Sequence, residues 1–241
     1  MRQRLRKGVI LVAFLLLPVT LYYFSPYLIV EGVSKGIITG SFIVFGALFL
    51  SALFLGRSFC SWFCPLAGIQ EASFLAKNKG VNNKYNWIRY IIWVPWIVLI
   101  IYMTITAGGL NKVDFTYQTT YGVSLSDITV LPMYFTIVFL AVILSFAVGK
   151  RGFCHYICWM SPFMIGGRKF RNLFEWPSLR LKADKSKCVD CKTCTKNCPM
   201  SLDVNAMVGS RSMENSECIL CGSCVDNCEK GVITYSFSKG I

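Results

Sequence analysis

The chain is short of histidine, and this shortage excludes one common kind of redox cofactor. His155 is the only histidine among 241 residues, so the chain cannot supply the two histidines that would ligate a haem from both sides. The sequence also contains no C-x-x-C-H segment for covalent haem attachment. We therefore expect no haem and no relay of haems across a membrane.

Acidic residues are also scarce, with 12 against 25 lysines and arginines and a formal charge of +13. Residues 186–241 contain six residues of each sign, so the whole excess lies in the preceding part. Basic residues beside apolar segments are typical of membrane topology and of contact with anionic lipid. We therefore expect membrane lipid as a partner and no nucleic acid.

Hydrophobic residues make up 54% of the chain, which is more than one soluble core needs. Four runs approach the ~20 residues that cross a bilayer; they are Gly8–Phe24, Gly36–Leu55, Ile88–Thr106 and Pro132–Val148. No comparable run follows Val148. The first run has basic residues before it, as a secretory signal does, but no small-x-small cleavage pattern follows. The sequence predicts four transmembrane helices, the first of them retained.

Basic residues predict how these helices are oriented, because cytoplasmic loops collect lysine and arginine. They gather before the first run, between the second and third runs, and after the fourth. The predicted protein is therefore a multi-pass protein of the cytoplasmic (inner) membrane, with both termini and all 12 cysteines on the cytoplasmic side. Disulfides are not expected in that reducing compartment.

The cysteine spacing after residue 186 indicates metal binding instead. The segments "CVDCKTCTKNCP" and "CILCGSCVDNC" repeat a C-x2-C-x2-C-x3-C pattern, which resembles bacterial two-cluster ferredoxins. The resemblance implies an α+β domain with two 4Fe-4S clusters, in which each run supplies the fourth ligand of the other cluster. It assigns Cys188, Cys191, Cys194 and Cys228 to one cluster, and Cys218, Cys221, Cys224 and Cys198 to the second. Zinc is the alternative for such thiolates, and Glu229 stands where that family commonly has proline.

A second pair of cysteine motifs follows the apolar runs. The segment "GRSFCSWFCP" aligns with "KRGFCHYICW", and each follows two predicted spans. This indicates two parallel two-helix repeats whose motifs meet at the cytoplasmic end. The four cysteines of the two motifs would then form one site for a third Fe-S cluster, which we expect to be 4Fe-4S, with Cys60, Cys64, Cys154 and Cys158 as its ligands. One cluster per motif, zinc and plain packing or redox thiols are the alternatives. Arg57, Lys150 and Arg151 are expected to offset the charge of this site.

The whole arrangement is similar to the NapH-type membrane ferredoxins of periplasmic nitrate reduction and to related polyferredoxin-like proteins. Trp159 departs from that pattern, because it replaces the proline that follows the last cysteine in the first motif. The expected domains are a membrane domain (1–167), a basic linker lying on lipid headgroups (168–185) and a ferredoxin domain (186–241).

The resemblance implies electron transfer between a soluble cytoplasmic redox protein, or a reductase subunit, and membrane quinone or a larger membrane complex, as in a quinol dehydrogenase. Arg57, Trp62, His155 and Trp159 are the residues expected near a quinone. Aromatic residues at a membrane boundary are more often anchors, and a histidine there is more often a hydrogen-bond donor to a metal site or a surface residue. Two other functions fit the same residues. One is a reductive assembly factor that supplies electrons to a metal or cofactor of another enzyme, and the other is a zinc-stabilised membrane scaffold.

Overall fold

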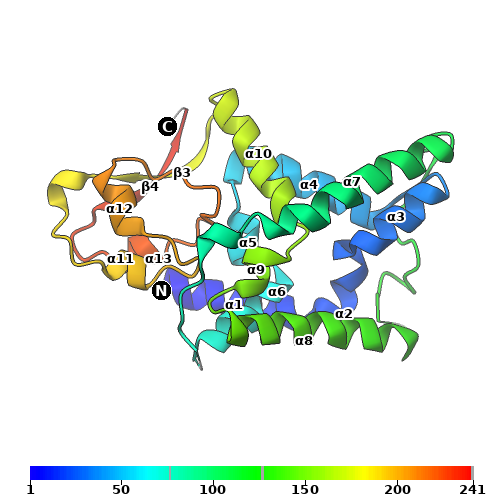
Figure 1. Cartoon of the computed structure of the whole chain (residues 1–241), viewed down its shortest axis with the longest axis horizontal. Coiled ribbons are helices and arrows are strands. Elements are labelled where there is room, and N and C mark those ends of the chain that lie inside the picture. Colours follow the sequence, from blue (N-terminus) through cyan, green and yellow to red (C-terminus); the bar gives the residue numbers. More distant parts are fainter. Residues whose placement is uncertain (76, 126–127, 240–241) are drawn as a thin grey trace.

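The structure is a computed structural model that describes residues 1–75, 77–125 and 128–239. Figure 1 shows a larger helical part and a smaller part, built by the end of the chain, that contains a sheet and short helices. The last two positions of the predicted ferredoxin domain, 240–241, lie outside the described residues. The N-terminus lies against the smaller part, where Arg2 pairs with Asp226.

The first half of the helical part contains two apolar helical segments, a cysteine motif and a returning helix. Its elements are α1 (Arg2–Leu15), α2 (Leu17–Thr20), η1 (Leu21–Phe24), α3 (Pro26–Ser34), β1 (Ile37–Thr39), α4 (Gly40–Leu55), α5 (Ser58–Trp62), α6 (Pro65–Ala72) and η2 (Ser73–Leu75). Pro18 lies at the start of α2 and cannot donate a backbone hydrogen bond, which favours a helix break at Leu16. The predicted first span is therefore bent by 58°.

The second half repeats this order. Its elements are η3 (Asn83–Tyr85), α7 (Ile88–Thr106), β2 (Lys112–Asp114), η4 (Ile128–Val130), α8 (Leu131–Ala147), α9 (Gly152–Tyr156) and α10 (Ser161–Leu173). Strands β1 and β2 pair in parallel, with Ile37 opposite Lys112. This short pairing joins the two halves at the end of the helices remote from the cysteines.

The returning helices α6 and α10 lie close to other helices because glycines leave room for them. A Cβ atom on Gly68 of α6 would lie 2.6 Å from the carbonyl oxygen of Ile10 in α1. A Cβ atom on Gly167 of α10 would lie 2.6 Å from the carbonyl oxygen of Phe49 in α4. Each cysteine motif is thus held between a long helix and a helix that packs back into the bundle (Figure 1).

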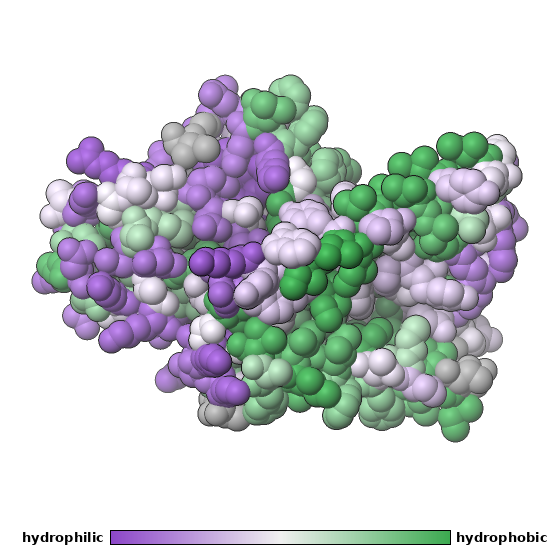
Figure 2. Space-filling model, viewed as in Figure 1, coloured by the Kyte–Doolittle hydropathy of each residue, from purple (hydrophilic) through white to green (hydrophobic). Residues whose placement is uncertain are grey.

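The predicted apolar runs form helices of different lengths, except that Ile37–Thr39, at the start of the second run, form strand β1 and the helix begins only at Gly40. Among the described residues, the stretch Asn83–Thr106 is long and apolar enough to cross a membrane, and the bent pair from Arg2 to Phe24 would be a second. Helices α4 and α8 have 16 and 17 residues, slightly fewer than the ~20 of a typical span. Four membrane-spanning helices therefore stay a prediction. Figure 2 shows hydrophobic residues gathered over α7 and α8 and hydrophilic residues over the smaller part.

The smaller part contains β3 (Ser178–Ala183), η5 (Lys185–Lys187), α11 (Thr193–Lys196), α12 (Val204–Gly209), α13 (Ser223–Asp226) and β4 (Ile233–Ser238). Strands β3 and β4 are antiparallel, with Ser178 opposite Ser238 and Ala183 opposite Ile233. The structure therefore adds to the ferredoxin domain a strand that the sequence analysis placed in the linker.

The rest of that linker also differs from the prediction. Arg168, Arg171 and Arg180 are at most 5% exposed and contact the carboxylate of Glu214. The prediction that these three arginines lie on lipid headgroups is wrong, because a distant carboxylate pairs with them inside the protein. Phe170, on the same segment, is 50% exposed.

Candidate metal centres

The first cysteine set of the ferredoxin domain surrounds one cavity. Cys188, Cys191, Cys194 and Cys228 all line a space of about 190 Å³. Three of them come from the segment that leads into α11, and Cys228 comes from the end of the other run, after α13. Cys191 is exposed to solvent. The structure thus brings together the residues of the first predicted ligand set at an accessible edge.

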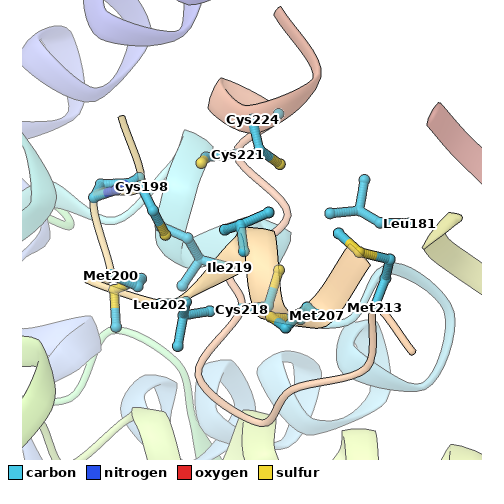
Figure 3. Close-up of a pocket in the computed structure, with 13 residues that line it drawn as sticks. Leu181, Cys198, Met200, Leu202, Met207, Met213, Cys218, Ile219, Cys221 and Cys224 are labelled. Carbon is cyan, nitrogen blue, oxygen red and sulfur yellow. The ribbon is translucent and has the colours of Figure 1, made fainter. Parts of the chain in front are cut away.

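The second set lines another cavity, drawn in Figure 3. Cys198, Cys218, Cys221 and Cys224 lie around it with apolar side chains that include Met200 and Ile219. Burial raises the pKa of the Cys198 thiol to about 12. A thiol this buried becomes a thiolate only when a cation compensates its charge, so the donor set fits a metal centre.

The two runs also share a backbone conformation. Asp190 and Lys192 flank Cys191 with positive φ values of 52° and 57°, and Leu220 and Gly222 flank Cys221 with 52° and 73°. Alternating left-handed residues of this kind turn backbone N–H groups toward a common point, where they can stabilise an anion. The loops are therefore shaped for an anionic group such as thiolate-bound iron.

The two C-x3-C motifs are equivalent in structure. The backbone N–H of Cys64 donates to the carbonyl of Phe59 at 3.0 Å, and that of Cys158 donates to the carbonyl of Phe153 at 2.9 Å. Trp159 therefore does not prevent the second motif from forming the same turn as the first, although it replaces a proline. This agreement supports the alignment of the two segments.

The four cysteines of these motifs meet in the interior. All are between 4 and 7% exposed. Burial raises the pKa of Cys64, and the nearby Cys154, Cys60 and Cys158 thiols raise it further by mutual repulsion. Burial likewise raises the pKa of Cys158 to about 12, with Cys154 and Cys60 adding to the effect. Four thiols that repel one another when ionised form a donor set that requires a cationic group.

Two arginines at equivalent positions of the motifs face this site. Arg57 and Arg151 each precede the first cysteine of their motif by three residues and are at most 1% exposed. Burial opposes their charge, but the Glu217 carboxylate and Cys60 raise the pKa of Arg57, and Glu71 and Cys154 raise that of Arg151. Both guanidiniums are therefore charged beside the thiols.

Each of these guanidiniums also retains an unused donor. Within the described part of the chain, the buried Nε atoms of Arg57 and Arg151 have no hydrogen-bond partner. A buried N–H without a partner costs about 1–3 kcal/mol, and a thiolate or sulfide acceptor at the cysteine site would remove that cost. These two unpaired donors suit an iron–sulfur cluster at this site, because its sulfur atoms would accept their hydrogen bonds.

Arg151 connects this site with the ferredoxin domain. Its guanidinium interacts electrostatically with Cys154 of the C-x3-C site and with Cys221 of the second tail set. Arg168 donates to the carbonyl oxygen of Cys218 at 2.6 Å. The C-x3-C site therefore lies next to the set drawn in Figure 3.

Two buried carboxylates pair with buried arginines, and the sequence analysis did not identify either; of the two, Glu217 joins the tail to the helical part. Glu217, from the tail, pairs with Arg57 at 2.9 Å and with Arg89 of α7 at 2.6 Å. Glu71 of α6 pairs with Arg6 at 2.7 Å and also with Arg151. Glu71 is the only acidic residue between Glu31 and Asp114, and this isolation in an apolar region was the available signal.

These ion pairs leave an excess of buried positive charge. Seven arginines, each at most 5% exposed, contact only three carboxylates among the described residues; they are Arg6, Arg57, Arg89, Arg151, Arg168, Arg171 and Arg180. Such an excess is costly unless anionic groups lie nearby. The buried thiolates of the two neighbouring cysteine sites would supply them.

The cysteines do not converge as the ligands of one ion would. Over residues 1–75, 77–125 and 128–239, no three His, Cys, Asp or Glu side chains form a group that could hold a single metal ion. A zinc site needs four donors around one atom, whereas an iron–sulfur cluster presents several irons to its cysteine ligands.

The residues predicted near quinone lie mostly inside the protein. Arg57 is 1% and His155 is 0% exposed, and the Nδ1 atom of His155 lies 2.9 Å from Asn86 Oδ1. Burial lowers the pKa of His155 to about 3, so its ring is neutral. Trp62 is half-buried, and the indole N–H of Trp159 donates to the carbonyl of Phe24.

Two family comparisons agree with this geometry. A family described as "4Fe-4S binding domain" matches residues 37–82 and 130–177, so each match contains one C-x3-C motif. A second, described as "4Fe-4S dicluster domain", matches residues 187–233, which contain all eight tail cysteines. No solved structure matches the chain.

Curated relatives carry related names. The chain is 25% identical over 173 residues to the methylamine utilization ferredoxin-type protein MauN of Methylobacillus flagellatus, covering 69% of this chain and 55% of that protein. It is 23% identical over 204 residues to the putative electron transport protein YccM of Escherichia coli, covering 78% and 54%. An uncharacterized protein of Methanocaldococcus jannaschii is 31% identical over 166 residues, covering 63% and 62%.

The matches span a little over half the length of these relatives. The two family matches indicate 4Fe-4S binding domains, and together with these relatives they make the chain similar to polyferredoxin-like proteins.

Proposed function

We propose that this chain is a membrane-anchored carrier with three 4Fe-4S clusters, which passes electrons between a soluble cytoplasmic redox protein and membrane quinone or a membrane partner. The observation that carries the proposal is the order of the three cysteine sites. The first tail set is accessible through Cys191, and its Cys194 interacts electrostatically with Cys224 of the second set. Arg151 interacts with Cys221 of the second set and with Cys154 of the C-x3-C site.

The chain's own residues would supply the conditions that such transfer needs. When bound, the clusters would supply one-electron chemistry. Cys60, Cys64, Cys154 and Cys158 would hold the third of them away from water, since all four are buried. Arg57 and Arg151 would stabilise its negative charge through the donors that they do not use elsewhere.

The apolar surface supports the membrane part of the proposal. Helix α7 exposes a series of large apolar side chains: Ile91, Ile92, Val94, Val98, Leu99, Ile101, Tyr102 and Ile105. Helix α8 exposes Phe135, Phe139, Ile143 and Phe146. Contiguous apolar surface of this kind marks contact with lipid or with another protein, and the basic residues at one end suit a cytoplasmic membrane surface.

Iron analysis tests the number of clusters. Three 4Fe-4S clusters require about twelve iron atoms per chain in anaerobically prepared protein, four for each cluster. About eight iron atoms would contradict the third cluster. Colourless protein that contains zinc and no iron would instead favour the zinc-stabilised scaffold.

Proteoliposomes test whether electrons need quinone to cross the membrane. A reductant is added on the side of the ferredoxin domain, and an impermeant acceptor is trapped on the other side. We expect the acceptor to stay oxidised without quinone and to become reduced when quinone is included, because every cysteine site lies toward one end of the helices. Rapid reduction without quinone would contradict the proposal. Failure under both conditions would favour an assembly factor or a missing protein partner.

A further inference from the structure

A large apolar pocket lies on the helical part, away from the residues that the sequence analysis placed near quinone. It has a volume of about 520 Å³ and is lined by α3, α4, α7 and α10. Sites for small molecules usually measure about 300–1,000 Å³ and are lined by aromatic and aliphatic side chains with a few polar groups. The pocket is therefore large enough for a ring-sized molecule.

The walls of the pocket are aromatic. Phe163 of α10 packs edge-on against Phe45 of α4, with centroids 5.2 Å apart, and against Trp93 and Trp96 of α7 at 5.5 and 5.8 Å. All four line the pocket. Aromatic faces and edges favour a flat ring over a flexible acyl chain.

Two glycines keep the pocket open. A Cβ atom added to Gly46 would meet no atom within 4 Å, and one added to Gly166 would come no closer than 3.8 Å to Phe49. Neither glycine is required by helix packing, and Gly costs about 1 kcal/mol relative to Ala inside a helix. Both line the pocket, so their effect is to leave space for an occupant.

One polar group in the lining has no partner. The indole Nε1 of Trp93 is buried and makes no hydrogen bond among the described residues, whereas Trp96 Nε1 donates to the carbonyl of Pro26 at 3.2 Å. A buried donor without a partner is uncommon. Because the atom is out of reach of water, a rotation of the indole would be needed to present it to the pocket, where a ring that carries a carbonyl oxygen would satisfy it.

The pocket adjoins the C-x3-C site. Phe163 lines the pocket, and Met164, the next residue of α10, places its Sδ atom 3.4 Å from Cys60 Sγ. Two consecutive residues of α10 therefore contact the pocket and a cysteine of this site. A molecule that binds here and exchanges electrons would be close to the predicted third cluster.

We propose that this pocket binds the ring of a lipid-soluble quinone, with Trp93 Nε1 donating to one ring carbonyl. This inference rests on the proposed function, which supplies the redox partner. Reduction of the quinone to the quinol consumes two electrons and two protons. A soluble one-electron donor on the side of the ferredoxin domain is the source of the two electrons, and water is the source of the two protons. Clusters bound in the cysteine sites would supply the one-electron chemistry between donor and quinone.

A photoreactive azidoquinone tests the pocket in the purified full-length protein. Labelled peptides are identified by mass spectrometry, and we expect the label on α4, α7 or α10. Gly46→Leu should fill the pocket and lower the yield about tenfold or more, since a packed cavity has no room for both groups. Gly8→Leu is the matched control, because Gly8 is an exposed helical glycine that also has open space around its Cβ position and lies outside the pocket.

The proposed hydrogen bond has its own variant. Trp93→Phe keeps an aromatic ring but removes the donor, so quinone affinity should fall roughly 2- to 10-fold, the range of one neutral hydrogen bond. Trp87→Phe, at an exposed residue outside the pocket, should leave affinity unchanged. Equal labelling of Gly46→Leu and Gly8→Leu, label on other segments, or displacement by oleic acid as effective as by unmodified quinone would each overturn the proposal.

The same samples separate this inference from the proposed function. Iron content and the dithionite-sensitive visible spectrum report on the clusters independently of the label. If quinone reoxidises the reduced clusters while the label lies elsewhere, the pocket assignment fails and the proposed function stands. If the label marks the pocket but iron is absent, the proposed function fails and the quinone pocket stands.

Discussion

Glu217 offers a direct test of how the ferredoxin domain is held on the helices. Its carboxylate contacts Arg57 at 2.9 Å and Arg89 at 2.6 Å, and both arginines are 1% exposed. The substitution Glu217→Gln preserves size and one acceptor oxygen but removes the charge. It removes the carboxylate that pairs with two buried guanidiniums.

The structure indicates the size of the effect. Burial raises the pKa of Glu217, but Arg57 and Arg89 outweigh burial and lower it from 4.5 to about 2. At about 1.4 kcal/mol for each pKa unit, this difference corresponds to about 3 kcal/mol at neutral pH. Removing one partner of a buried ion pair typically costs about 3–5 kcal/mol, so the two values agree.

Thermal unfolding followed by circular dichroism measures this cost. For a chain of this size, about 3 kcal/mol lowers the Tm by roughly 6–12 °C. Asp226→Asn is the matched control, because Asp226 also joins the tail to the helical part but pairs with Arg2 at an exposed site, with side chains 30 and 32% exposed. Such a pair contributes at most about 1 kcal/mol. A Tm for Glu217→Gln within about 2 °C of wild type, or equal to that of Asp226→Asn, would refute the reasoning.

Three further predictions follow from the same structure. The Tm difference between wild type and Glu217→Gln should have its full size above about pH 5 and shrink as the pH falls toward 2, because the wild-type carboxylate then becomes protonated. A Tm difference that does not change with pH would contradict the ion-pair explanation. Serine at Cys60 or at Cys154 should change the same EPR signal and leave the two tail signals intact, whereas different signals would argue against a shared site. Gly167→Ala should cost about 1–3 kcal/mol through overpacking, because its Cβ atom would lie 2.6 Å from a backbone oxygen. Gly166→Ala has open space and should not destabilise the protein, and equal effects would contradict this packing.

Much of the local structure could be predicted from the sequence because it depends on nearby residues. The apolar runs form helices, and α7 begins and ends at Ile88 and Thr106, as predicted. The bend at Leu16 was not predicted, although Pro18 was visible as its local cause. The spacing of the tail cysteines indicated 4Fe-4S binding, which the family matches support. Their ligand assignment and the transmembrane role of the helices stay predictions.

Contacts between distant segments could not be read in the same way. The basic segment 168–180 has the composition of a headgroup-binding linker, yet Arg168 and Arg171 are buried against Glu214. The sequence does not show that Arg168 and Arg171 will meet Glu214, because that contact depends on how α10 packs along α4. The apolar pocket depends on the same packing, since four separate segments line it.

The sequence by itself determined the elements and the chemistry available to this protein, because helix-forming runs, turn residues and cysteine spacings act over a few residues. The tertiary structure decided which of these groups meet. It brings Cys60 and Cys154 into one buried site, places Arg151 between that site and Cys221, and leaves a pocket beside Met164. The physical reason is that burial and charge pairing act between neighbours in space, and those neighbours here lie up to 224 residues apart in the chain.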